Sequence, residues 1–558
     1  MFEKNKFTIL TVFALFLVVI AYYSGLFIDL TADAGIYGSV ARHIFDSGDL
    51  INLQIHGDAY EQKPPLLFWL AALGFKIFGV GNIGYKIFPV LYAFLGVFFV
   101  YKLGEVLYNK KVGKIATFLL LFSECYFLYC MDVHTDLVLQ TNVTFAIWQL
   151  ALYIKNKKKL NFVLGFAGVG LAILSKGPIG AAVPALALCT HLIMKKDFKQ
   201  LFNLKWLIGI FIALVIASPA FIGLYRHFGL EGIKFFFITN NVGRITGEYA
   251  GSNTDYFFYF HTLLYLFAPW SLLMYAGLFF EFKSVFKKPL KQKEYFLTGG
   301  IIFYFFIISI ARGKAPNYIF IIIPLFSVLT AKWISIYSER LESKGWKTLR
   351  IMQDVFLGLL WIFLTIVMVY LFPSGEWYYW AFYGIILLFC VYIFTQKEKS
   401  LALESLLLPS ILTITMIAFY LNIYMLPFVY KYQAAPKAAR IYNRESIPGE
   451  KMYNYLYPQF EIFFYSKTNA LEICNKKSLK KILKEPGSWI FTTETGYDSI
   501  KELNVPVGAI YHLKNRGMNR IRLNFIMPET RRESLNDTYL IKSEGGKNSV
   551  SVKLKKKL

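Results

Sequence analysis

The chain has 558 residues, of which 56% are hydrophobic and 18% are aromatic, and its mean hydropathy is +0.46. Apolar runs of this length indicate an integral membrane protein and exclude an ordinary soluble domain. The formal net charge of +25 would suit a nucleic-acid partner. About half of it lies in turns between apolar segments, however, so no nucleic-acid partner is expected.

The apolar runs predict an all-α polytopic membrane bundle of about thirteen transmembrane helices over residues 1–429. The first is expected to be a retained helix, because its long apolar run lacks a convincing cleavage site. Residues 66–79 are too few to span, so they predict an interfacial or re-entrant helix. The expected spans are residues 7–28, 85–107, 113–131, 137–154, 160–175, 177–194, 205–225, 262–281, 295–311, 318–336, 352–372, 378–395 and 401–427.

Basic turns orient this bundle, since Lys and Arg gather on the cytoplasmic side of bacterial membranes. With this span count they all fall on one side, which places the polar loop 29–84 on the external side. Residues 430–558 are then a small external α/β domain, because apolar runs there shorten to strand length at 488–492 and 507–511. Its basic end suits anionic membrane lipids, although a solvated tail explains it equally well.

Polar residues that gather in five external loops are the candidate site, and four of these loops carry cations. Five of these residues are cations placed against the orientation trend, and a lipid phosphate would account for them. The first loop supplies carboxylates that accept a proton and a lysine that neutralises a phosphate. The candidates are Asp33, Glu61, Lys63, Asp136, Lys176, Arg244, Arg312, Lys314 and Tyr318.

Several of these residues also have a structural interpretation. Asp33 would serve as a helix cap if a helix begins near residue 34. Lys63 would extend toward headgroups, although Pro64 and Pro65 after it suggest a fixed position. Asp136 would pair with Lys176 or Arg312, and Tyr318 would belong to an aromatic belt. His134 and His261 are isolated, and lone histidines near an interface seldom bind metal.

The order of these motifs resembles the membrane glycosyltransferases of the GT-C fold, over nearly the whole chain. Within that group it is similar to the bacterial aminoarabinose transferases that modify lipid A and to the protein O-mannosyltransferases. The motifs are Asp33, Lys63-Pro64-Pro65-Leu66 leading into Trp69, Asp136, Leu174-Ser175-Lys176-Gly177-Pro178, and Lys314-x-Pro-x-Tyr318-Ile followed by Pro324.

The resemblance implies inverting transfer of a sugar from a polyprenyl-phosphate donor to a lipid A-like or protein acceptor outside the bacterial inner membrane. Asp33 would be the main catalytic carboxylate, and Asp136, in the same cavity, would be a second catalytic residue. Glu61, Lys176 and Arg244 would line that cavity. The donor phosphate would be held by Lys63, Arg312, Lys314 and Tyr318.

Two departures from the family pattern bear on cofactors. Gln62 stands where the family has Glu directly before the lysine, and Asn240-Asn241 stands where Glu-His is common. The resemblance therefore implies no tightly held zinc, and no cofactor is assigned. A divalent metal remains an alternative, because Glu61 stands directly before Gln62 and could supply the missing carboxylate.

Two other functions compete with sugar transfer. A transporter or flippase of a lipid-linked sugar would place charges at mid-span, whereas the candidate residues lie at external helix ends. A non-enzymatic scaffold would not need cations in four separate loops. The sugar, the choice between lipid and protein acceptor, and the oligomeric state stay open.

Overall fold

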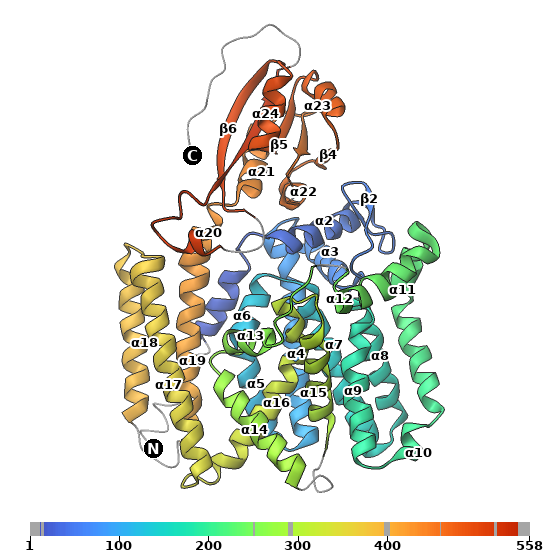
Figure 1. Ribbon diagram of the computed structural model, residues 1–558, viewed down its shortest axis with the longest axis vertical. Helices are drawn as coiled ribbons and strands as arrows, with labels where there is room; N and C mark the ends of the chain where they lie inside the picture. The colour runs from blue at the N-terminus through green and yellow to red at the C-terminus, as the bar shows by residue number, and fades with distance from the viewer. Residues whose placement is uncertain are drawn as a thin grey trace.

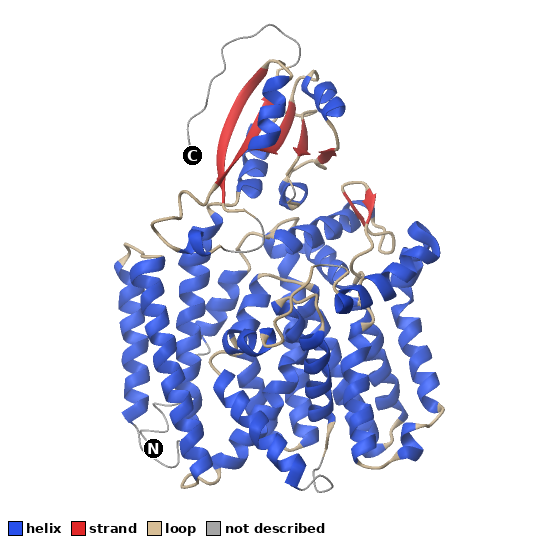
Figure 2. Ribbon diagram, in the orientation of Figure 1, coloured by secondary structure: helices blue, strands red, loops and turns tan. Residues whose placement is uncertain are grey.

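A computed structural model describes residue 12 and residues 16–248, 251–287, 294–395, 402–457, 459–517 and 522–544. Its helices form an upright bundle with a small domain of strands and helices on one end (Figures 1 and 2). We call this end the domain-bearing face. The basic tail near residue 558 and residues 7–11 of the first expected span lie outside the described residues.

The bundle is built from long apolar helices that alternate in direction (Figure 1). In α11 the helix breaks at Gly229, whose φ of 60° is left-handed, before it continues. The bundle helices are α4 (Asn82–Leu107), α5 (Lys110–Leu121), α6 (Glu124–Met131), α7 (Thr135–Asn156), α8 (Lys159–Lys176), α9 (Ile179–Met194), α10 (Phe198–Leu201), α11 (Lys205–Lys234), α13 (Phe258–Leu266), α14 (Ser271–Lys287), α15 (Phe296–Ile310), α16 (Ile323–Ser338), α17 (Lys344–Ile366), α18 (Trp377–Thr395), α19 (Ala402–Tyr420) and α20 (Leu426–Tyr430).

The chain is a multi-span membrane protein. Among the described residues, eight helices are long and apolar enough to cross a membrane, or nine if the bent pair α5 and α6 is one span. Shorter apolar helices such as α9 and α15 occupy other expected positions. The polytopic helical fold is therefore confirmed, whereas the number thirteen is not.

The first loop folds over the end of the bundle as two helices joined by a short hairpin (Figure 1). These elements are α2 (Ala32–Ser47), β1 (Gln54–Ile55), β2 (Asp58–Ala59) and α3 (Leu66–Phe78). The 13 residues of α3 are too few to span, in line with the expectation for this segment. Trp69 ties α3 to the loop by donating from Nε1 to the carbonyl of Leu50 at 2.7 Å.

The C-terminal domain contains a five-stranded mixed sheet in the order β4-β3-β5-β7-β6. The expected strands at 488–492 and 507–511 are present as β5 and β6, and helices flank the sheet. The elements are α21 (Ala434–Glu445), β3 (Lys451–Tyr455), α22 (Glu461–Tyr465), β4 (Leu471–Ile473), α23 (Lys476–Leu483), β5 (Ser488–Thr493), α24 (Glu494–Glu502), β6 (Val507–Asn515), α25 (Leu523–Ile526) and β7 (Asn536–Ser543). The domain boundary at residue 430 stays a prediction.

Helix α22 joins this domain to α2. Two glycines of α2 allow the close approach, since a Cβ on Gly35 would lie 3.1 Å from Cγ of Glu461, and one on Gly38 would lie 2.9 Å from the Phe464 ring. Arg42 donates to the carbonyl groups of Phe464 and Ser466 at 3.0 and 2.5 Å. These contacts position α2 from the C-terminal domain.

Candidate active site

A cavity of about 130 Å³ lies at the domain-bearing end of the bundle, and it collects candidate residues from five separate segments. These segments are the first loop, α7, α8, α12 (Val242–Thr246) and η3 (Pro316–Ile322). Its polar and charged lining residues are Lys63, Asp136, Lys176, Asn240, Asn241, Arg244, Tyr304 and Tyr318; its apolar lining includes Leu139, Ile179, Ile307 and Ile308.

Asp136 is the buried carboxylate of this cavity, with 1% of its surface exposed. One oxygen accepts from Nζ of Lys176 at 2.5 Å, and the other accepts from the Asn317 amide at 2.8 Å. The Lys176 ammonium also lies 4.7 Å from the centre of the Tyr318 ring. Because both Asp136 oxygens are engaged, this residue is better suited to holding Lys176 in place than to accepting a proton.

Arg244 of α12 lines the same cavity as Asp136 and Lys176. Its Nε donates to the carbonyl and the side-chain oxygen of Asn240 at 3.0 and 3.1 Å, and its Nη1 donates to the Tyr318 hydroxyl. The Asn240 amide in turn donates to the carbonyl of Gln62 at 3.1 Å. Arg244 is therefore oriented toward the loop that carries Lys63.

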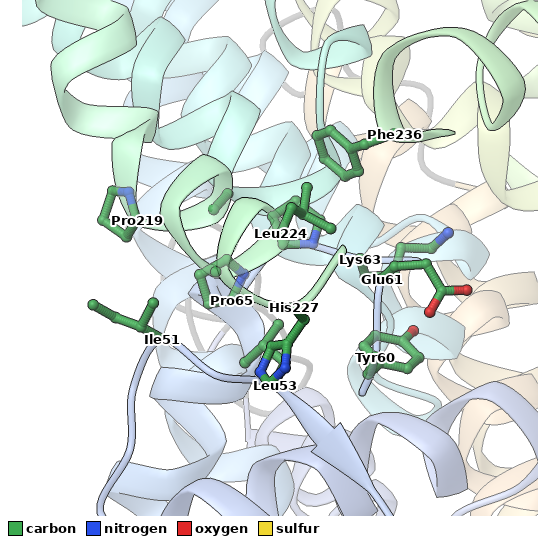
Figure 3. A pocket seen from close by; sticks show the side chains of 13 residues that line it. Ile51, Leu53, Tyr60, Glu61, Lys63, Pro65, Pro219, Leu224, His227 and Phe236 are labelled. Atoms are coloured by element: carbon green, nitrogen blue, oxygen red, sulfur yellow. The ribbon is translucent and has the colours of Figure 1, made fainter. Parts of the chain in front are cut away.

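Lys63 lines this cavity and also a second, smaller pocket beside α11. Figure 3 shows that pocket, with Pro219 and Leu224 of α11 on one side and Glu61 and Lys63 on the other. Burial, together with the neighbouring cations Lys176 and Arg244, lowers the pKa of Lys63 to about 7 against the opposing effect of the carboxylates Asp136 and Asp33. An anion in the cavity would favour its charged form.

Asp33 lies in the first turn of α2, where its side chain is exposed, and it lines neither pocket. Its charge nevertheless acts to raise the pKa of Lys63. Burial lowers the pKa of His134, but Asp132, 3.2 Å away, and the charge of Asp33 together raise it to about 9. Asp33 is thus an accessible carboxylate whose charge acts on Lys63 and on the charged imidazole of His134.

The capping role considered for Asp33 is not realised. Thr31 occupies the N-cap position of α2, and Glu461 of α22 accepts from the Ala32 N–H at 2.9 Å. Burial raises the pKa of this Glu461 carboxyl to about 7. The helix end next to Asp33 is therefore capped from the C-terminal domain, which leaves the Asp33 carboxylate exposed.

Two expected phosphate ligands lie outside the cavity. Lys314 donates to the carbonyl of Asn253 at 2.8 Å and lies 5.6 Å from the centre of the Tyr256 ring. Arg312 pairs with Ile245 through its backbone, and its side chain lies against Gly247. Both belong to the turn between α15 and η3; Ala311 and Gly313 of this turn and Tyr318 of η3 line the cavity, whereas Arg312 and Lys314 do not. Their role in phosphate binding stays a prediction.

The described residues contain no group of three or more His, Cys, Asp or Glu side chains that could hold a metal ion. Asp132 and His134 form a pair, and His261 pairs with Asp255 at 2.7 Å at an exposed position. These pairs offer two ligands each. The question of a divalent metal therefore stays open.

Sequence reasoning did not find two residues that organise the site. Asn317 holds Asp136, but an amide in a turn gives no signal of its partner. Glu461 is 429 residues from the backbone group that it caps, and nothing in the local sequence indicates that contact. By contrast, Lys63, Asp136, Lys176, Arg244 and Tyr318 do converge as expected.

Residues 62–222 match the family model described as dolichyl-phosphate-mannose-protein mannosyltransferase. An uncharacterized protein of Aquifex aeolicus is 26% identical over 402 residues, which are 71% of this chain and 74% of that protein. An undecaprenyl phosphate-alpha-4-amino-4-deoxy-L-arabinose arabinosyl transferase of Edwardsiella ictaluri is 26% identical over 56% of this chain. The chain spans only 56% of the length of that transferase.

The fold also has a solved counterpart. The crystal structure of ArnT from Cupriavidus metallidurans bound to undecaprenyl phosphate matches with a TM-score of 0.73 and 17% sequence identity, over 95% of this chain and 97% of that chain. Its structure in the apo state matches with a TM-score of 0.72. The chain therefore has the GT-C fold and resembles the aminoarabinose transferases, and together these comparisons support a membrane glycosyltransferase.

Proposed function

We propose that the chain transfers a sugar from a polyprenyl-phosphate donor to a lipid A-like or protein acceptor at the domain-bearing face, on the periplasmic side of the inner membrane. The observation that carries this proposal is the charge of the cavity. Lys63, Lys176 and Arg244 face it together with one carboxylate, Asp136. The excess of cations in a partly buried space suits a phosphate.

The apolar part of the lining suits the lipid portion of such a donor. Leu139, Ile179, Ile307 and Ile308 belong to bundle helices that continue into the apolar body of the protein. A phosphate that binds the cations would place its polyprenyl chain against this wall and its sugar toward the cavity mouth. The sugar then lies on the side where Asp33 is exposed.

In the proposed reaction, the acceptor oxygen attacks the anomeric carbon from the face opposite the phosphate. The new bond forms between that oxygen and the carbon, while the bond from the carbon to the phosphate oxygen breaks with its electron pair. Asp33 takes the proton of a hydroxyl acceptor, or orients a phosphate acceptor that carries no such proton. Inversion at the carbon follows from this geometry.

The leaving polyprenyl phosphate gains negative charge in the transition state. Lys63 and Arg244 are positioned to stabilise that charge, and the hydroxyl of Tyr318, already held by Arg244, adds a third donor. Interactions that strengthen as the charge develops lower the barrier more than those that bind the donor equally throughout. The phosphodiester donor supplies the driving force, so no nucleotide is needed.

The test is mass spectrometry of lipid A and of envelope proteins from cells with the native chain, without it, or with Asp33→Asn. A glycan on either pool that requires both the chain and Asp33 supports the proposal and identifies the acceptor class. If both pools stay unchanged while a lipid-linked sugar accumulates on one membrane face, sugar transfer is rejected and transport takes its place.

A further inference from the structure

A groove at the end of the bundle opposite the C-terminal domain has no role in the proposed reaction. It lies between the first residues of α5 and of α19, and its volume is about 420 Å³. Figure 1 shows α19 rising from this end toward α20 and the domain. The groove is lined by Lys110, Lys111, Lys114, Ile115 and Phe118 of α5, and by Leu403, Glu404, Leu407, Leu408 and Ile411 of α19.

The two walls have a regular pattern. On α5, Lys110, Lys114 and Phe118 are four residues apart and therefore share one face of the helix. On α19, Leu403, Leu407 and Ile411 share a face in the same way. Eight residues of helix cover about 12 Å, so each wall is long enough for a substantial part of an acyl chain.

Among the described residues, the charged rim has one net positive charge when Glu339, the partner of Lys111, is counted with the lining residues. Lys111 is paired with Glu339 at 3.1 Å and donates to the hydroxyl of Ser338 at 3.0 Å. Lys110 and Lys114 are exposed and form no hydrogen bond or ion pair within the described part of the chain. Counting Glu404 with Glu339, three lysines face two carboxylates.

We propose that this groove binds one anionic glycerophospholipid, with its phosphate between Lys110 and Lys114 and an acyl chain along the apolar walls. The single negative charge of a phosphatidylglycerol matches the net charge of the rim. The phosphate would also lie at the start of α5, where the helix dipole favours an anion. Basic pockets between membrane helices on the lysine-rich side are suited to such headgroups.

This site is separate from the sugar-transfer cavity and does not depend on the proposed function. Helix α5 leads through α6 to the loop that carries Asp132 and His134, whereas α19 leads through α20 to the C-terminal domain. A lipid in the groove would contact both helices at the end opposite the C-terminal domain.

The experiment uses the full chain in phosphatidylcholine nanodiscs with a trace of photoactivatable phosphatidylglycerol, followed by peptide mapping. We expect crosslinks on α5 and α19 that fall about 25-fold in Lys110→Gln/Lys114→Gln, since each of the two lysines near a bilayer surface adds roughly fivefold to the binding of an acidic lipid. The matched control Lys155→Gln/Lys158→Gln changes two exposed lysines that do not line this groove. Its crosslinks should equal those of the native chain.

A second variant tests the apolar part. Leu407→Trp fills the groove without changing charge, so it should also reduce the crosslinks. Excess unlabelled phosphatidylglycerol should compete, whereas phosphatidylethanolamine and polyprenyl phosphate should not. Crosslinks that persist in the double lysine variant, or that either of those two lipids removes equally well, would overturn the proposal.

Discussion

The two ends of the membrane bundle both gather lysines, but in different surroundings. At the domain-bearing end, Lys63 and Lys176 face a partly buried cavity, and Lys176 is fixed between Asp136 and the Tyr318 ring. At the opposite end, Lys110 and Lys114 are exposed on the rim of an open groove. We therefore expect binding in the cavity to depend on the exact position of each charged group. Binding of a lipid headgroup in the groove should depend only on the sign of the charge.

The largest effect is expected for Asp33→Asn. If Asp33 is the catalytic carboxylate, this change should lower transfer by a factor of about 10²–10⁴, because it removes a proton acceptor at the reacting atoms. The measurement is transfer of a labelled sugar from polyprenyl phosphate by the purified chain. Asp58→Asn is the matched control, since Asp58 lies in the same loop with 82% of its side chain exposed. An equal loss of transfer activity in both variants would show that Asp33 is not the catalytic carboxylate.

A smaller loss, about 10-fold to 100-fold in donor kcat/KM, is expected for Lys63→Ala, because a charge-assisted bond to the phosphate is removed. Lys63→Arg should also lose activity, since a guanidinium does not fit the place of an ammonium. The conservative change Lys114→Arg in the groove should leave activity unchanged. If Lys63→Arg were as active as the native chain, the two ends of the bundle would tolerate arginine in place of lysine equally well.

The pH dependence of the donor KM tests whether the charge of Lys63 binds the donor. The pKa of Lys63 is lowered to about 7, so raising the pH from 6 to 8 deprotonates it and removes a positive charge from the cavity. The donor KM should therefore rise over this range in the native chain. In Lys63→Arg the guanidinium stays charged, so the KM of the activity that remains in this variant should not change with pH. A KM that rises equally in both forms would assign the dependence to another group.

Gly38→Ala should have a smaller effect on activity, since it perturbs α2 indirectly. The new methyl group would lie 2.9 Å from both Phe464 and Leu30 and would push α22 away from α2. Overpacking of this kind costs about 1–3 kcal/mol. The measurement is the melting temperature together with kcat. Gly358→Ala in α17 is the control, because nothing lies within 4 Å of its new methyl group. Identical behaviour of the two variants would mean that α22 does not position α2.

The helices and most of the cavity could be predicted from the sequence, whereas the direction of some side chains could not. Apolar runs predict the helices, because each span must bury its backbone polar groups within itself. Loop order brings Lys63, Asp136, Lys176, Arg244 and Tyr318 together as expected. Lys314 shares the Tyr318 turn but points to Asn253, since the direction of a side chain in a turn depends on packing that no periodicity records.

The cap on α2 has a consequence for how the protein is made. The N–H group of Ala32 donates a hydrogen bond to the carboxylate of Glu461, which is synthesised 429 residues later. Until that part of the chain has been made and has folded, α2 has neither its cap nor the contact with α22 that holds it. We expect a chain interrupted before Glu461 to insert into the membrane without acquiring activity, so that only fully translated molecules would consume the donor lipid.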